Sequence, residues 1–169
     1  MKTGLLRPFC LTIPAAAILL GGCVSDNPGE RPKVGPPPAN PVVGRMFMAA
    51  QAPQDTDSNG YMDTFVVTIY LFQTNYARSV RAPGEFHFKL TGKGGKVLRE
   101  WTLKEPGPLV AAINAGVGPG YVMKMSLLVD KGTDEFPVQS AEVVASFIDK
   151  SGIVVEAQPT ALLIGKIMP

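Results

Sequence analysis

The sequence has few of the residues on which most catalytic and metal-binding sites depend. Among its 169 residues are one histidine, one tryptophan and two cysteines. A single histidine excludes a zinc site built on a histidine pair, and two cysteines exclude a disulfide framework. His87 lies on the polar side of an alternating segment, which favours an exposed side chain over a catalytic base. No G-x-S-x-G motif is present, and the glycine-rich run 116–120 lacks the lysine of a phosphate-binding loop.

A hydrophobic run long enough to cross a membrane is also missing. The apolar stretch over residues 9–20 has about a dozen residues, against the ~20 that span a bilayer. It follows the basic residues Lys2 and Arg7 and ends in the small residues Gly21 and Gly22. A basic start, a short apolar middle and small closing residues are the three parts of a secretory signal. We therefore expect residues 1–22 to be a signal peptide.

The residues at the end of this signal are more specific. The run Leu20-Gly21-Gly22-Cys23 resembles the lipobox of bacterial lipoproteins. The resemblance implies that the Cys23 thiol takes a diacylglycerol group, that cleavage occurs before Cys23, and that the new amine is acylated, as with palmitate. Two or three acyl chains at ~0.8 kcal/mol per buried methylene anchor a protein almost permanently. The alternative is a secreted protein with ordinary cleavage and a free thiol at Cys23.

The residue after the lipobox bears on localisation. In lipoproteins of enteric bacteria, an aspartate directly after the cysteine retains the protein at the inner membrane. Here Val24 holds that position, and Asp26 comes too late to count. The resemblance therefore implies a lipid-anchored protein of the cell envelope, placed in the outer membrane.

Charge is balanced once the signal is removed. The mature chain then has fourteen basic and fourteen acidic residues, since the sixteen basic residues of the full chain include Lys2 and Arg7. Without a Lys/Arg cluster there is no electrostatic footprint for nucleic acid, and we expect no nucleic-acid partner. Cys23 is the only cysteine left, so the fold has no disulfide to support it.

Residues 23–44 are predicted to be the lipidated cysteine and a disordered linker. Prolines and glycines dominate the segment and large apolar residues are almost absent: Pro28, Gly29, Pro32, Gly35, Pro36, Pro37, Pro38, Pro41 and Gly44. Such a composition cannot bury enough surface to offset its ordering entropy, and consecutive prolines hold it extended. Some twenty residues reach roughly 60 Å at most. A tether is the main interpretation, and a proline-rich ligand for another protein is the alternative.

From about residue 45 onward the apolar residues recur with a period of two, which predicts strands. In residues 85–91 apolar side chains alternate with polar ones, and residues 96–103 place Val97, Trp101 and Leu103 on one face, interrupted by Arg99. The glycines between them predict a hairpin. Residues 66–72 are apolar on both faces, which is typical of a central strand.

Four more strands are predicted, over 121–129, 141–148, 153–156 and 161–164, with a tight turn at 149–152. Residues 109–114 fit either a short strand or a turn of helix, and no longer window has a helical period. Short strands at this spacing predict an all-β domain over residues 45–169, a single antiparallel β-sandwich without an internal repeat.

One loop has the residues of a metal site. Oxygen-bearing side chains occupy alternate positions from Asp55 through Asp57 to Asn59, then a glycine follows, and Asp63 comes three residues later. This pattern resembles the D-x-D-x-N-G-x-x-D loops of calcium-binding families. The resemblance implies side-chain oxygens from Asp55, Asp57 and Asn59, the backbone carbonyl of Tyr61, and Asp63 directly or through water. Calcium takes six to eight oxygens, so the chain must curl around it.

Two other kinds of loop share these residue types, and only one of them remains an alternative. Val66 stands where a helix–loop–helix calcium hand requires glutamate, which excludes that class. The same residue types also form a solvated Asx-turn. A further carboxylate from the acidic loop at Asp130, Asp134 and Glu135 reaches the metal loop only if the number of intervening strands brings it to the same end of the sandwich. The ambiguous segment 109–114 leaves that open.

The sequence therefore predicts a membrane-anchored envelope lipoprotein, not an enzyme, with a calcium-stabilised β-sandwich that binds an envelope protein or a glycan. Met46, Met48 and Trp101 are candidates for a binding surface, although the inward position of Trp101 favours the core. One alternative function is an accessory subunit of an envelope or secretion complex. The other is a carboxylate-based hydrolase such as a glycosidase, which requires two carboxyl groups about 5–10 Å apart in a cleft.

Overall fold

A computed structural model describes residues 35–104 and 117–166 of the chain. The predicted signal peptide, Cys23, most of the linker and the ambiguous segment 109–114 lie outside these residues. Within the described residues no helix is long and apolar enough to cross a membrane. The helical elements there are two single 3-10 turns, η1 (Lys93–Gly95) and η2 (Val129–Lys131).

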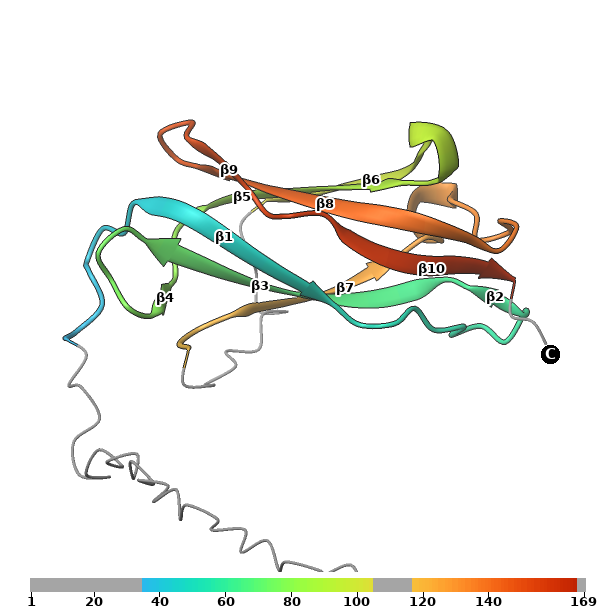
Figure 1. The fold of residues 1–169 in the computed structure, drawn as a ribbon, viewed down its shortest axis with the longest axis horizontal. Helices are drawn as coiled ribbons and strands as arrows, with labels where there is room; N and C mark the ends of the chain where they lie inside the picture. Colours follow the sequence, from blue (N-terminus) through green and yellow to red (C-terminus); the bar gives the residue numbers. More distant parts are fainter. Residues whose placement is uncertain (1–34, 105–116, 167–169) are drawn as a thin grey trace, which may run out of the picture. The chain divides into compact units, whose positions relative to one another are not determined.

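The described residues form two antiparallel β-sheets that pack face to face (Figure 1). In the first sheet β3 (Thr64–Gln73) is central, with β1 (Val43–Ala50) on one side and β4 (Ser79–Val80) and β7 (Tyr121–Ser126) on the other. The second sheet has the order β2 (Tyr61–Met62), β10 (Thr160–Lys166), β8 (Gln139–Asp149), β5 (Gly84–Thr91) and β6 (Val97–Lys104), and β9 (Val154–Glu156) also pairs with β8. The all-β antiparallel sandwich predicted from the alternation is confirmed.

The core lies between the sheets and is built from alternate residues of the central strands. Phe65, Val67, Ile69 and Leu71 of β3 point inward, and each is at most 1% exposed. From the opposite sheet Phe86, Phe88 and Leu90 of β5 meet them, with the apolar residues of β8 beside them. A period of two therefore puts one face of each strand in the core, as predicted.

The predicted hairpins are present. β5 pairs with β6 across η1, where Gly94 and Gly95 have φ of 72° and 77°, a region that glycine occupies without strain. The turn at 149–152 is closed by a hydrogen bond from the Gly152 N–H to the Asp149 carbonyl, 3.0 Å long. Arg99, which interrupts the inward face of β6, donates to the Val129 carbonyl and lies 3.7 Å from the Asp130 carboxylate.

Three details differ from the sequence analysis. The strands β1, β2 and β4 were not predicted, and β1 begins at Val43, a buried residue two positions before the expected domain start. Met46 and Met48 are buried in the core, so they do not form a surface. The strand predicted over 121–129 ends at Ser126, because the chain turns at η2, where Asp130 has a φ of 48°.

Candidate metal centre

The aspartate loop connects β1 to β2 and β3 and is closed at its base by backbone pairing. The Gln54 N–H donates to the Thr64 carbonyl at 2.7 Å, and the Asp63 N–H donates to the Gln54 carbonyl at 3.0 Å. Residues 55–62 therefore form a closed loop whose two ends lie side by side. Asp55, the first residue of this loop, and Asp63, the residue directly after it, are brought together.

Asp55 organises the turn. Its carboxylate accepts hydrogen bonds from the backbone N–H groups of Ser58 at 2.7 Å, Gly60 at 2.9 Å and Asn59 at 3.3 Å. Gly60 has a φ of 87°, which allows the chain to reverse here. Desolvation would raise the pKa of Asp55, but the N–H groups of Gly60 and Ser58 outweigh it and lower the pKa. The carboxylate is therefore held as the anion.

Asp63 is the buried member of the loop, with 0% of its surface exposed. It accepts hydrogen bonds from the Thr56 N–H at 2.8 Å, the Thr56 hydroxyl at 2.7 Å and the Asp57 N–H at 3.2 Å. Burial would raise the pKa of Asp63, yet the hydroxyls of Thr64 and Thr56 and these backbone groups lower it. A buried anion with this many donors fixes the start of the loop against its end.

The pKa of Asp57 is shifted in the opposite direction to the pKa values of Asp55 and Asp63. Its carboxylate is exposed and accepts from the Asn59 N–H at 3.2 Å. Desolvation raises its pKa, and the nearby Asp55, Asp134 and Asp63 carboxylates raise it further. The other carboxylates therefore disfavour the ionised form of Asp57, and a bound cation would relieve this repulsion.

Asp134 reaches the loop from a distant part of the sequence. It is 3% exposed, and its Oδ2 accepts a hydrogen bond from the Asn59 Nδ2 group at 2.9 Å. The same Nδ2 group donates to the Asp57 carboxylate at 3.2 Å, and Asn59 Oδ1 accepts from the Tyr61 N–H at 2.8 Å. The question that the sequence left open is thus answered: the loop after β7 returns to the aspartate loop.

The carboxylates of Asp55, Asp57 and Asp63 could hold a metal ion. One oxygen from each lies within 4.8 Å of the other two. Ligands about 2.3–2.6 Å from a calcium ion lie at most about 5 Å from one another, so this spacing fits a shared ion. Tyr61, expected to offer its carbonyl, is the first residue of β2 and pairs with Lys166 of β10.

Thr56 and Asp134 are the members of the site that the sequence analysis did not assign. Thr56 occupies a variable position of the loop pattern, and its hydrogen bonds to Asp63 carry no signal in the spacing. Asp134 is separated from Asn59 by 75 residues. Its contact depends on the strand order, which a single sequence does not determine.

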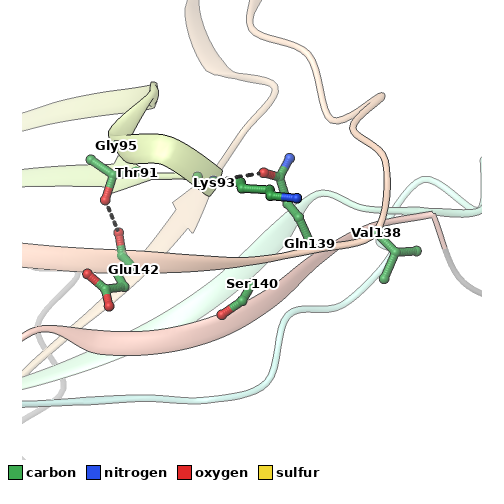
Figure 2. A pocket seen from close by; sticks show the side chains of 8 residues that line it. Thr91, Lys93, Gly95, Val138, Gln139, Ser140 and Glu142 are labelled. Carbon is green, nitrogen blue, oxygen red and sulfur yellow. Dashed lines mark hydrogen bonds between the residues drawn. The ribbon is translucent and has the colours of Figure 1, made fainter.

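Two of the hollows on the second sheet exceed 400 Å³. One, of about 480 Å³, is bordered by the β5–β6 turn and the start of β8. Figure 2 shows that two of its polar side chains serve local structure: Gln139 accepts from the Lys93 backbone N–H at 3.1 Å, and Thr91 donates to the Glu142 carbonyl at 3.3 Å.

The other hollow, of about 430 Å³, lies on the outer face and includes His87, Glu100 and Glu156. The His87 Nδ1 atom lies 3.3 Å from the Thr102 hydroxyl, and Nε2 contacts the Glu85 carboxylate without hydrogen-bond geometry. Trp101 is half-buried on the inner side instead, edge-on to Phe65, and donates from Nε1 to the Ser126 carbonyl at 3.0 Å.

Comparison with known proteins gives a likeness in structure alone. No protein family and no curated protein matches this chain. A solved structure described as the X-ray structure of Northeast Structural Genomics Consortium target SoR45 is similar over 74% of this chain and 86% of that chain. The sequence identity is 14% and the TM-score is 0.33.

Proposed function

We propose that this protein is an outer-membrane lipoprotein of the cell envelope whose β-sandwich is a non-catalytic, calcium-stabilised interaction module. The observation that carries the proposal is the run Leu20-Gly21-Gly22-Cys23 at the end of a short apolar segment. Acylation of Cys23 anchors the chain, and the proline-rich residues 24–42 hold the sandwich away from the bilayer. The work of the protein is then done by the sandwich surface, with an envelope protein or a glycan as partner.

The calcium assignment rests on the geometry of the aspartate loop. Asp55, Asp57 and Asp63 offer hard oxygen ligands within a suitable separation, and Asp134, which is buried, adds a fourth carboxylate beside them. The pKa of Asp57 is raised first by desolvation and then by the nearby Asp55, Asp134 and Asp63 carboxylates, whose repulsion a bound cation would relieve. Calcium accepts such an irregular oxygen set, whereas magnesium demands a tighter octahedron.

Asn59 indicates how the loop would respond to the ion. Its Nδ2 group lies between the Asp57 and Asp134 carboxylates and donates to both. A cation in that place would take the amide oxygen instead, which requires a half-turn of the amide and the loss of its hydrogen bond from the Tyr61 N–H. Calcium therefore replaces a network of hydrogen bonds with direct oxygen ligands, and we expect it to stabilise the loop rather than to reshape the sandwich.

The rival function, a carboxylate hydrolase, finds less support in the described residues. Glu100 of β6 and Glu156 of β9 border the same hollow, but their strands are three strand spacings apart, about 14 Å. Glycosidases use carboxyl pairs about 5–9.5 Å apart. Glu100 is also paired with Lys89 at 3.3 Å. No observation favours this pair as a catalytic acid and base.

The experiment that tests the proposal is affinity capture of the native lipoprotein from detergent-solubilised envelopes, in excess calcium and in excess chelator. A stoichiometric protein partner would support the interaction module in an envelope complex, and a retained glycan without protein would support a glycan-binding module. Turnover of the retained glycan would overturn the non-catalytic assignment. Recovery of the protein alone under both conditions would overturn the interaction module.

A further inference from the structure

The outer surface of the first sheet has an unusual composition. Inward positions of β1 and β3 fill the core, and the alternate positions face outward together with those of β7. We call the resulting surface the aromatic face, and the side chains on it that the argument uses are Arg45, Phe47, Tyr70, Phe72, Val122 and Lys124. In the register of β1 and β3, Phe47 lies opposite Tyr70, and Arg45 lies opposite Phe72. Residues distant in sequence therefore form one continuous surface.

The aromatic side chains on this surface make ordered contacts: Phe47 is open to solvent, and Tyr70 and Phe72 are half-buried. Phe47 is 57% exposed, and its ring centroid lies 6.4 Å from that of Tyr70. The Arg45 guanidinium lies 6.0 Å from the centroid of Phe72. A Cβ at Gly120 would come within 2.8 Å of the Tyr70 ring, so glycine there lets the ring lie against the backbone. An ordered aromatic surface loses little entropy when it binds.

The charge of the aromatic face has one sign. None of the four strands of the first sheet contains aspartate or glutamate, and their charged residues are Arg45 and Lys124. The outer face of the second sheet differs, because it carries Glu85, Glu100, Glu142 and Glu156 against Lys89 and Lys104. A partner of the aromatic face should therefore be anionic as well as apolar.

The size of the face limits the kind of partner. Three strands are about 14 Å wide and ten residues of β3 are about 33 Å long, or roughly 450 Å². A stable complex of two globular proteins buries about 800 Å² on each. A second copy placed on the same face would also set Arg45 and Lys124 against their own kind. The surface thus fits a short segment better than a dimer.

We propose that the aromatic face binds an acidic peptide segment of a partner protein. Its aromatic or aliphatic side chains would pack on Phe47 and Tyr70, and its carboxylates would pair with Arg45 and Lys124. Phe, Tyr and Arg are enriched at protein interfaces, and Tyr and Arg are frequent among the residues that dominate the binding energy. This inference rests on the proposed function as an interaction module, and it names the surface and the partner chemistry.

The test is selection of a random twelve-residue peptide library on the purified mature lipoprotein in detergent micelles. We expect the recovered peptides to be enriched in Asp or Glu together with aromatic or aliphatic residues, and to bind with micromolar affinity that weakens as salt is raised. Phe47→Ala should weaken binding about tenfold, and Arg45→Glu more. Leu163→Ala is the matched control, because Leu163 is equally exposed, at 63%, on the other sheet. It should leave affinity unchanged.

Three results would overturn this inference. The library could yield no binding peptides, or it could yield peptides without acidic enrichment. Wild type and correctly folded Phe47→Ala could also bind the peptides with equal affinity. A monomer–dimer equilibrium lost in Phe47→Ala would assign the face to a second copy instead. Phe47-dependent binding to vesicles of phosphatidylglycerol and phosphatidylcholine, without peptide binding, would assign it to a membrane. If envelope capture still recovers a partner with Phe47→Ala, only the surface assignment fails and the proposed function stands.

Discussion

Asp63 shows how one residue serves both the fold and the candidate site. Its carboxylate is buried, and the donors around it come from Thr56 and Asp57 on the opposite side of the loop. Removing the charge leaves these donors without a strong acceptor, at a cost of about 1–3 kcal/mol. We therefore predict that Asp63→Asn lowers the free energy of unfolding by this amount at pH 7 in chelator, as measured by urea denaturation.

The pH dependence of this effect has a definite sign. The pKa of Asp63 is lower in the folded protein than its ordinary value of 3.8, so its contribution to stability is complete above that value. It is lost as pH falls below 3.8 towards the folded pKa. The difference between wild type and Asp63→Asn should therefore shrink in acid. Asp130→Asn, which changes an exposed carboxylate, is the control and should leave the free energy of unfolding unchanged at pH 7 and in acid. An equal effect of the two substitutions would contradict the prediction.

The predicted effect of calcium on stability can be tested at Asp57. If calcium is a hundredfold above its Kd, it stabilises the folded state by ~2.7 kcal/mol, a rise in Tm of several degrees. We expect Asp57→Asn to remove this rise while leaving the fold intact, because its side chain is exposed. Magnesium should do much less. Thermal melting in excess calcium and in excess chelator measures the effect, with Glu135→Gln as the control from the neighbouring acidic loop.

Protons and calcium should compete for Asp57. Since its pKa is raised above 3.8, protonation begins at a higher pH than for an ordinary aspartate, and the calcium-induced rise in Tm should shrink from there downward. Without calcium the sign is reversed, because the loop loses stability as pH rises through the folded pKa of Asp57 and this carboxylate ionises beside the other anions. Identical melting curves in calcium and chelator would show that the loop is only a solvated turn.

The candidate ligand residues of the loop could be predicted from the sequence, but the contact of Asp134 with this loop could not. The alternate spacing of Asp55, Asp57 and Asn59 is a local pattern, so it is visible in the sequence. Asp134 contacts Asn59 only because β7 runs back beside β3, and that pairing spans more than fifty residues. Local pattern therefore gives the loop, whereas the fourth carboxylate depends on tertiary topology.

At the level of elements, alternation predicts strands well where the outward residues are polar. β5 has Glu85 and His87 outward, so its boundaries were predicted almost correctly. β1 was missed because Phe47 breaks the alternation on its outward side. β3 was correctly placed as a central strand, yet its outward aromatics are half exposed rather than covered. Both departures come from the aromatic face, where apolar residues stand in outward positions.

β5 offers a direct test of this inside–outside pattern. Phe88 is 2% exposed and lies in the core, while its neighbour His87 points to the outer hollow. We predict that Phe88→Ala lowers the free energy of unfolding by ~3–5 kcal/mol, through lost burial and the cavity left behind. His87→Ala on the same strand should change it by about 0.5 kcal/mol or less. Chemical denaturation checks both, and comparable losses would contradict the assignment of faces.

For the molecule as a whole, fold class follows from the sequence but strand order does not. Repeated short alternating segments with glycine turns exclude helical classes, since a period of two does not gather the apolar residues on one face of a helix. The order within each sheet depends on long-range pairings such as β1 with β3 and β8 with β10. These pairings depend on side-chain packing across the sandwich, which no local pattern records.

The last prediction concerns the anchor that places the sandwich at a membrane. If the lipobox is used, the thiol of Cys23 is the only attachment point for the diacylglycerol group, because it is the one cysteine of the mature chain. Cys23→Ser should abolish labelling by radioactive palmitate and leave the protein uncleaved at this site or soluble after fractionation. The sandwich itself should keep its β-rich circular dichroism spectrum and its calcium-dependent melting, since neither depends on the lipid. Cys10→Ser is the matched control and should be labelled like the wild type, because Cys10 lies within the removed segment. Palmitate labelling that persists in Cys23→Ser would show that the chain is acylated elsewhere and that the lipobox assignment is wrong.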